Sequence, residues 1–349
     1  MNPNGDLASS VPPVSYVLPL RRDAVLDDET VAYLRRLSIE VDEVIVVDGS
    51  PPAIFDAHRR TWGREVTHVV PDPDRRTANG KVAAVLTGLE RARNDVVVTA
   101  DDDVRYRADR LRQVAERLET AEAVCPQNVF SPLPWHARWD TARMLVHRAI
   151  DHDMPGTIAV RRPFVASLEG YDGDSLFENL ELLRTIASAG GRIEHARDVF
   201  VERRPPSTRH FIGQRIRQAY DEFARPWRMV AWLSILPIVV SSTRRRIRVI
   251  VALALGSVVL AERGRRRDGG AGVFSAWASL WAPLWLAERA VCAWLAVLAR
   301  LRGGVRYHGV RLRKAATPAR RLRERAAVRA DMIVDPVPLA TARQEARNG

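Results

Sequence analysis

Three consecutive aspartates, Asp101, Asp102 and Asp103, follow a β-branched run at Val96–Thr99, with one alanine between. An Asp-x-Asp pair after a buried strand places two carboxylates on the same side of a short turn, and hard divalent cations prefer such oxygen ligands. A metal ion held by Asp101 and Asp103 could neutralise a diphosphate leaving group as a Lewis acid. The alternative is a solvated acidic turn that caps the helix expected near Asp109.

Polar or turn-forming residues also follow other predicted strands. Apolar runs end at Pro19 and at Asp48, and leucine and valine recur at helical spacing between the runs. Strands that alternate with helices in this way predict a parallel sheet with crossover helices. Because ligands bind beyond the carboxyl ends of such strands, Pro19, Asp48 and the aspartates should meet at one sheet edge. The expected strands are Val14–Leu18, Val44–Val47, Val66–Val70 and Val96–Thr99.

The order of these segments resembles the inverting glycosyltransferases of family 2. That family has the GT-A fold, a Rossmann-like mixed α/β sheet with flanking helices that binds nucleotide-diphospho-sugars. The resemblance covers about residues 14–226. The segments that carry it are Ser15–Pro19, Glu43–Ser50, Asn79–Leu89, Ala100–Asp103, Pro155–Arg162 and Gly170–Asp172.

The resemblance implies a nucleotide-diphospho-sugar donor and a divalent cation, Mg²⁺ or Mn²⁺. It assigns Pro19, Asp48, Lys81 and Asp101 to the donor, with Asp48 at the nucleotide base, and Asp101 and Asp103 to the metal. Lys81 opens a predicted helix, where backbone N–H groups favour anions. The alternative for Lys81 is an ordinary first-turn cation, which would be unfavourable against the helix dipole.

The catalytic base departs from the family pattern. In the family, the Asp of a Glu-Asp pair deprotonates the acceptor hydroxyl, but here Asn179 stands in its place. An amide cannot accept that proton, so the remaining carboxylates are Glu178 beside it and Glu181 one helical turn on. We assign the base to Glu178 because it keeps its place in the pair. The alternative is that both are first-turn acids that stabilise the helix dipole.

A second motif precedes the apolar part of the chain. His210–Gln218 resembles the Gln-x-x-Arg-Trp motif of cellulose synthase, hyaluronan synthase and ceramide glucosyltransferase, with Gln214 and Arg217 retained. Arg217 could hold the donor diphosphate by a bidentate contact. Gln218 stands in place of the Trp, the residue that would supply the stacking platform for an acceptor sugar. The alternative is a basic amphipathic helix on a membrane surface.

Charge divides the chain into two parts. Residues 1–226 carry a net charge of −4, whereas residues 227–349 carry +16. A basic end that follows a slightly acidic domain suggests a partner with negative charge. We expect a flexible terminus at residues 1–13 and a GT-A domain at residues 14–226. Two or three membrane-associated helices should follow at residues 227–300, and a basic cytoplasmic tail at residues 301–349.

Three apolar stretches lie in the basic part, each bordered by arginines: Trp227–Ser242, Ile247–Ala261 and Val273–Ala299. The first two reach roughly 22–24 Å as helices, which is short for a hydrocarbon core of about 30 Å. The third carries Glu288 and Arg289, which are costly in lipid unless they meet a partner. We expect membrane association through an inserted hairpin of the first two stretches or through helices that lie in the interface, and the role of the third stretch stays open. The alternative is a basic soluble helical domain.

The sequence therefore predicts a glycosyltransferase at the cell membrane, its catalytic domain facing the cytoplasm. The expected partners are the sugar nucleotide, a membrane lipid or lipid-linked acceptor and an anionic membrane surface. The alternative is a catalytically weakened, sugar-nucleotide-binding homologue or scaffold, as Asn179 and Gln218 suggest. A nucleotidyltransferase is disfavoured because Leu18–Arg22 has no glycine-rich loop. Nucleic acid is not an expected partner, since the arginine-rich tail lacks interleaved aromatic residues.

Overall fold

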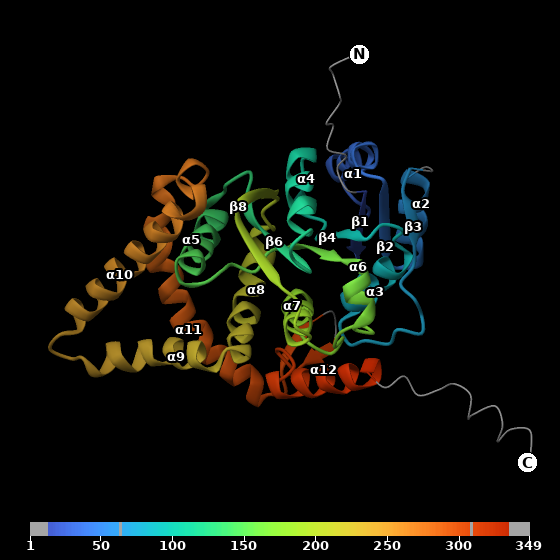
Figure 1. The fold of residues 1–349 in the computed structure, drawn as a ribbon. Coiled ribbons are helices and arrows are strands. Elements are labelled where there is room, and N and C mark those ends of the chain that lie inside the picture. Colours follow the sequence, from blue (N-terminus) through green and yellow to red (C-terminus); the bar gives the residue numbers. More distant parts are fainter. Residues whose placement is uncertain (1–12, 63–64, 308–309, 335–349) are drawn as a thin grey trace, which may run out of the picture.

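The computed structural model describes residues 13–62, 65–307 and 310–334 (Figure 1). The strands are β1 (Val14–Leu20), β2 (Glu43–Asp48), β3 (Thr67–Val69), β4 (Val96–Ala100), β5 (Val104–Arg105), β6 (Ala123–Phe130), β7 (Thr157–Arg161), β8 (Ile193–Arg203), β9 (Val305–Tyr307) and β10 (Val310–Leu312). The α-helices are α1 (Asp28–Glu40), α2 (Pro52–Trp62), α3 (Gly80–Arg91), α4 (Ala108–Arg117), α5 (Trp135–Ile150), α6 (Arg162–Ser167), α7 (Glu178–Ser188), α8 (Thr208–Tyr220), α9 (Pro226–Ser241), α10 (Arg246–Arg266), α11 (Ala282–Leu301) and α12 (Ala319–Val334). Short 3₁₀ helices are η1 (Asp221–Ala224), η2 (Arg267–Gly272) and η3 (Ala276–Trp281).

Within the described residues, eight strands form one sheet in the order β3-β2-β1-β4-β7-β6-β8-β5. β1 pairs in parallel with β2 and β4, whereas β7 is antiparallel to β4 and β6. The predicted mixed α/β sheet is confirmed, and the four expected strands correspond to β1, β2, β3 and β4. The carboxyl ends of β1, β2 and β4 therefore lie at one edge.

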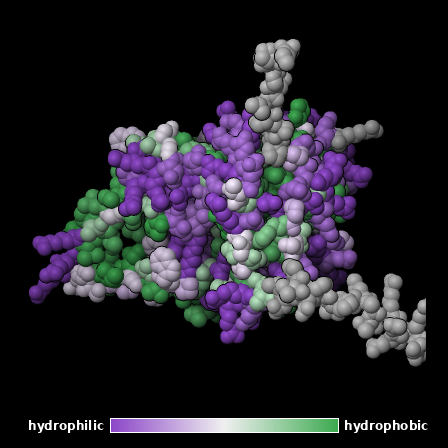
Figure 2. Space-filling model, in the orientation of Figure 1, coloured by the Kyte–Doolittle hydropathy of each residue, from purple (hydrophilic) through white to green (hydrophobic). Residues whose placement is uncertain are grey.

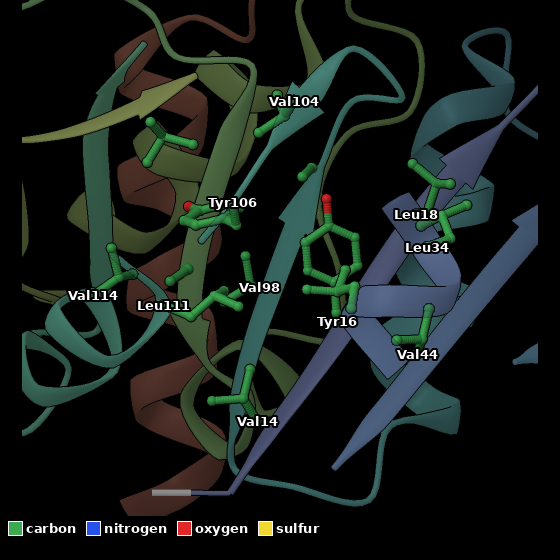
Figure 3. Packing of buried hydrophobic residues seen from close by; sticks show 14 of the residues in the cluster. Val14, Tyr16, Leu18, Leu34, Val44, Val98, Val104, Tyr106, Leu111 and Val114 are labelled. Carbon is green, nitrogen blue, oxygen red and sulfur yellow. The ribbon is translucent and has the colours of Figure 1, made fainter. Parts of the chain in front are cut away.

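Both faces of the sheet are covered. Tyr16 and Leu18 of β1 pack with Leu34 of α1 and Leu111 of α4 on one face (Figure 3). Val17 points to the other face, which α3, α6 and α7 cover. All seven residues of β1 are buried. Strands that are covered on both faces have continuous apolar sequences. The strands of this sheet were therefore predictable from apolar runs, without an alternation of apolar and polar residues.

The helical hairpin α9–α10 extends from the side of the domain, and α11 packs against α8, α9 and α10 (Figure 1). The second half of α10 lies directly on α5. A Cβ atom at Gly264 would lie 1.8 Å from the carbonyl oxygen of Leu145, so this close approach requires glycine. The buried guanidinium of Arg148, on α5, donates to the Gly264 carbonyl at 3.2 Å. α10 is therefore anchored on α5, at the side of the sheet domain.

Among the described residues, one helical stretch, Ala276–Leu301, is long and apolar enough to cross a membrane, and α9 is apolar but shorter. The charged pair on that stretch faces the protein. Arg289 is 1% exposed and donates to the Gln218 carbonyl at 2.7 Å. Glu288 lies 3.5 Å from Nη1 of Arg215. Both charges thus have partners on α8, as a charged pair in an apolar helix requires.

Candidate active site

A cleft of about 1140 Å³ opens at the carboxyl edge of the sheet. The ends of β1 and β4 and the starts of α3 and α7 form one side of it, and α5, α8 and α11 form the other. The structure brings most of the expected site residues to this one cleft. Those that line it are Pro19, Lys81, Asp101, Asp103, Glu178, Gln214 and Arg217.

Asp48 does not line the cleft, although its neighbour Gly49 does. The Asp48 carboxylate is buried and hydrogen-bonded to His58 Nδ1 at 2.7 Å, to His68 Nε2 at 3.0 Å and to the Ser50 backbone N–H at 2.9 Å. Burial raises the pKa of Asp48, but the hydrogen bonds from His68, Ser50 and His58 outweigh burial and hold it well below its ordinary value. Asp48 thus orders the end of β2, and its contact to the nucleotide base stays a prediction.

Asp101 and Asp103 lie on either side of Arg203, the last residue of β8. Arg203 Nε donates to both oxygens of Asp103 at 3.0 Å, and its Nη2 donates to Asp101 Oδ2 at 3.1 Å. A Cβ atom at Gly156 would lie 2.9 Å from Arg203 and 3.0 Å from Asp101 Oδ2. Glycine at this position therefore leaves room for the arrangement. The middle aspartate, Asp102, takes no part in the contact with Arg203.

Lys81 joins this pair to Glu178. Its Nζ donates to Asp101 Oδ1 and, at 2.5 Å, to Glu178 Oε1. The Asn79 side chain caps α3 by accepting the Lys81 backbone N–H at 3.2 Å, and its amide lies 3.4 Å from Glu178 Oε2. Because α3 begins at the sheet edge, its first turn presents the lysine to carboxylates from both β4 and α7.

The two candidate bases, Glu178 and Glu181, and the intervening Asn179 differ in their surroundings. Glu178 lines the cleft. Asn179 donates its amide to the Pro155 carbonyl at 3.1 Å. Glu181 is fully buried and accepts the backbone N–H of Thr317 at 2.8 Å, outside the cleft. Of the two carboxylates that the sequence left open, Glu178 is the one that a substrate in the cleft can reach.

The charges at the centre of the cleft shift one another's pKa. Burial raises the pKa of Asp101, but Lys81 and Arg203 outweigh it, so the pKa lies below the ordinary value. Burial raises the pKa of Asp103 as well, and the neighbouring aspartates add to this against Arg203, so its pKa lies above the ordinary value. Burial lowers the pKa of Lys81, but Asp101 and Glu178 raise it well above the ordinary value. On acidification, Asp103 is therefore the first of the pair to take a proton.

The α8 motif supplies the opposite wall. Arg217 lies 5.2 Å from the centre of the Tyr307 ring, and its charge helps to lower the pKa of Asp101. Gln214 contacts His210, one turn before it. Gln218, which stands where the Gln-x-x-Arg-Trp motif has its Trp, also lines the cleft. Tyr307 of β9 lines it too, so an aromatic side chain is present although the motif lacks its own.

Asp101 and Asp103 are the pair that the sequence predicts to hold a metal, and this role stays a prediction. Among the residues that the structure describes, no group of three or more His, Cys, Asp or Glu side chains could hold a metal. Two carboxylates nevertheless fit a Mg²⁺ ion that takes its remaining ligands from substrate phosphates and water. The donor set is therefore suitable for a divalent cation that binds together with a diphosphate.

Asp221 is a partly buried acid that lines the cleft, and its buried oxygen Oδ1 has no hydrogen-bond partner among the residues that the structure describes. Burial and the neighbouring Glu222 raise the pKa of Asp221 from 3.8 to about 6. The unfolded chain releases this proton at lower pH than the folded chain, so Asp221 costs stability as the pH rises from about 4 to 6.

We therefore expect Asp221→Asn to raise the free energy of unfolding at pH 8 by up to about 3 kcal/mol, and to change it little at pH 4. Melting curves of the two proteins at both pH values measure this. Equal effects at pH 4 and pH 8 would contradict it.

Residues 28–168 match the family model for Glycosyl transferase family 2. The match runs from α1 to α6 and includes Lys81, Asp101 and Asp103, but it ends before Glu178. No curated protein matches the chain.

Several solved structures are similar. Mannosyltransferase PcManGT from Pyrobaculum calidifontis, in complex with GDP-Man and Mn²⁺, has 20% identity and a TM-score of 0.45, over 93% of this chain and 86% of that chain. A mycobacterial protein has 22% identity and a TM-score of 0.42, over 57% and 70% of the two chains. Glucosyl-3-phosphoglycerate synthase from Mycobacterium tuberculosis, in complex with phosphoglyceric acid, has 18% identity and a TM-score of 0.41, over 57% and 74%.

Proposed function

We propose a specific reaction for this glycosyltransferase, whose residues 28–168 match the family 2 model. It moves a sugar from a nucleotide-diphospho-sugar to a membrane lipid or lipid-linked acceptor, such as a precursor of an envelope glycan, with inversion at the anomeric carbon. The observation that carries the proposal is the cluster in the cleft where Lys81 bridges Asp101 and Glu178. This cluster combines charges suited to a diphosphate with a carboxylate suited to proton transfer.

The chemistry is a single displacement. In this reaction Lys81 and Arg217, which both line the cleft, bind the donor diphosphate, and Pro19, which also lines it, contacts the nucleotide. The acceptor hydroxyl oxygen forms a bond to the anomeric carbon as the bond from that carbon to the diphosphate oxygen breaks. Glu178 takes the hydroxyl proton, and the nucleoside diphosphate leaves with the bonding electron pair. Attack from the face opposite the leaving group inverts the anomeric centre.

Asp101 and Asp103 would hold a divalent cation, Mg²⁺ or Mn²⁺. When bound, such a cation supplies neutralising charge to the diphosphate leaving group. Lys81 helps to keep Asp101 ionised, and glycine at position 156 avoids a clash of a side chain with Asp101 Oδ2.

A panel of nucleotide sugars tests the proposal. The purified chain, with a lipid acceptor extract, should release nucleoside diphosphate from a subset of donors, and the release should require Mn²⁺ or Mg²⁺. Binding of a nucleotide sugar without any release would instead favour the catalytically weakened homologue or scaffold that Asn179 and Gln218 suggest.

The proposed location is the cell membrane, with the catalytic domain on the cytoplasmic side. Apolar side chains gather over α9, α10 and α11 at one end of the molecule (Figure 2). The turn between α9 and α10 adds a cluster of exposed arginines, which attract anionic lipid headgroups. The exposed apolar residues include Trp227, Val230, Ile247, Leu255, Val259 and Trp277, and the arginines are Arg244, Arg245, Arg246 and Arg248.

The full-length chain is therefore expected to float with vesicles that contain anionic lipid. Exchanging the four turn arginines for glutamine should weaken binding to these vesicles by about 1 kcal/mol for each arginine near the surface. Vesicles of zwitterionic lipid are the control, since the same exchange should change binding to them little. Recovery of the wild-type chain in the soluble fraction, at low salt and without detergent, would contradict the membrane proposal.

A further inference from the structure

Arg203 occupies a position that no sequence motif assigned. It lies between the two carboxylates that are proposed to hold the divalent cation. Both oxygens of Asp103 accept from its Nε, and Asp101 Oδ2 accepts from its Nη2. The remaining oxygen, Asp101 Oδ1, accepts from Lys81. All four carboxylate oxygens of the pair are thus bonded to cations of the protein.

The charges of this cluster nearly cancel without a metal. Asp101, Asp103 and Glu178 face Lys81 and Arg203, all five partly or fully shielded from solvent. A divalent cation between the two aspartates would lie within a few ångströms of the guanidinium, and like charges repel strongly where water is scarce. Contact of Arg203 with the pair and metal binding by the pair therefore exclude one another.

The side chain of Arg203 has room to leave. Its backbone is held where β8 ends, because the next residue, Arg204, donates its N–H to the Asp103 carbonyl at 2.7 Å. The Arg203 side chain is 24% exposed and lines the cleft proposed to bind the donor. A rotation of that side chain alone would free the aspartates and carry the guanidinium into the cleft.

We propose that Arg203 is an internal counter-cation that competes with the divalent metal for Asp101 and Asp103. The proposal rests on the proposed function, since it takes the pair to be a metal site. Without donor, Arg203 stays bonded to Asp101 and Asp103 and blocks metal binding by the pair. A donor diphosphate offers the displaced guanidinium a new bidentate partner, so metal and donor enter together. Arg203 is then a positioning residue that sets the affinity for the metal.

The test measures binding of Mn²⁺ alone to the full-length chain, by electron paramagnetic resonance of the free ion. Arg203→Met removes the charge and keeps the length of the side chain. Its Kd for Mn²⁺ is expected to be at least about tenfold lower than that of the wild type, because the ion no longer displaces a guanidinium.

Arg22→Met is the matched control. Arg22 pairs with Asp102 at 2.5 Å, so this variant removes one cation from the same acidic triplet without opening the pair. Its Kd for Mn²⁺ should change by less than about threefold, the range expected for a more exposed ion pair.

Mn²⁺ binding by Arg203→Met that is no tighter than wild type would overturn the proposal, as would an equal gain in Arg22→Met. Melting curves establish that each variant is folded. If Arg203→Met does not fold, Arg203→Lys decides, because it keeps the charge but loses the forked contact. A lower Kd than wild type supports competition, and an unchanged or higher Kd overturns it. No donor is present, so the outcome is independent of the nucleotide-sugar panel.

Discussion

Replacing Glu178 by glutamine is expected to lower kcat by about 10²- to 10⁴-fold, the usual loss when a general base is removed. The amide keeps the size of the side chain and its place at the start of α7, but it cannot take the acceptor proton. The KM for the donor should change little, because Lys81 keeps its contact with Asp101. Initial rates at varied donor and acceptor concentrations separate the two quantities.

Glu181→Gln is the matched control, since it makes the same change one helical turn away. The Glu181 side chain accepts the backbone N–H of Thr317 outside the cleft, and the amide oxygen of glutamine can accept the same bond. We expect a kcat close to that of the wild type. A large loss in Glu181→Gln together with an active Glu178→Gln would move the base to Glu181. A strong gain of activity in Asn179→Asp would indicate a naturally weakened enzyme.

The second large effect is expected at Asp103. Asp103→Asn keeps the shape of the side chain but removes the charge that Arg203 or a metal needs, so kcat/KM should fall by about 10²- to 10³-fold, as for other lost electrostatic contacts to a transition state. Activation by Mn²⁺ should be lost in parallel. Rates measured across a Mn²⁺ titration, and again in excess chelator, test both statements.

Asp102→Asn provides the comparison within the same turn. Asp102 pairs with the half-exposed Arg22 rather than with Arg203, so its loss should change kcat/KM less than about threefold. Full wild-type activity in excess chelator would contradict the metal role of the pair, and equal losses in the two variants would contradict the assignment to Asp103.

The fold was predictable because its signals are local. The runs around Val17, Val46 and Val98 are apolar on both faces, and the structure buries them between two helical layers. That Asp101 follows β4 at the same sheet edge as the end of β1 was expected from the rule that parallel strands share a carboxyl edge, although β1 continues through Pro19 to Leu20. These predictions needed no knowledge of which distant segments meet.

The side-chain contacts of the site could not be predicted in this way, because they depend on which distant segments meet in the fold. Arg203 is one of 52 arginines, and nothing in its neighbourhood distinguishes it until β8 brings it beside β4. His58 and His68 were likewise overlooked, because their convergence on Asp48 depends on how α2 and β3 pack. Glu181 gave no sign that it would accept a bond from Thr317, which is 136 residues away. Side-chain partners of this kind depend on tertiary structure rather than on spacing.

The direct contact of α10 with α5 at Gly264 has a mechanical consequence. α5 contributes Asp140 and Arg143 to the wall of the cleft, while the other end of α10 carries exposed apolar residues such as Ile247 and Leu255. Backbone rests on backbone at Gly264, so no flexible side chain is present to absorb a change in angle. The α9–α10 hairpin and α5 should therefore move together about their contact at Gly264. In the proposed membrane-bound state, a tilt of the hairpin would therefore move the part of the cleft wall that α5 contributes.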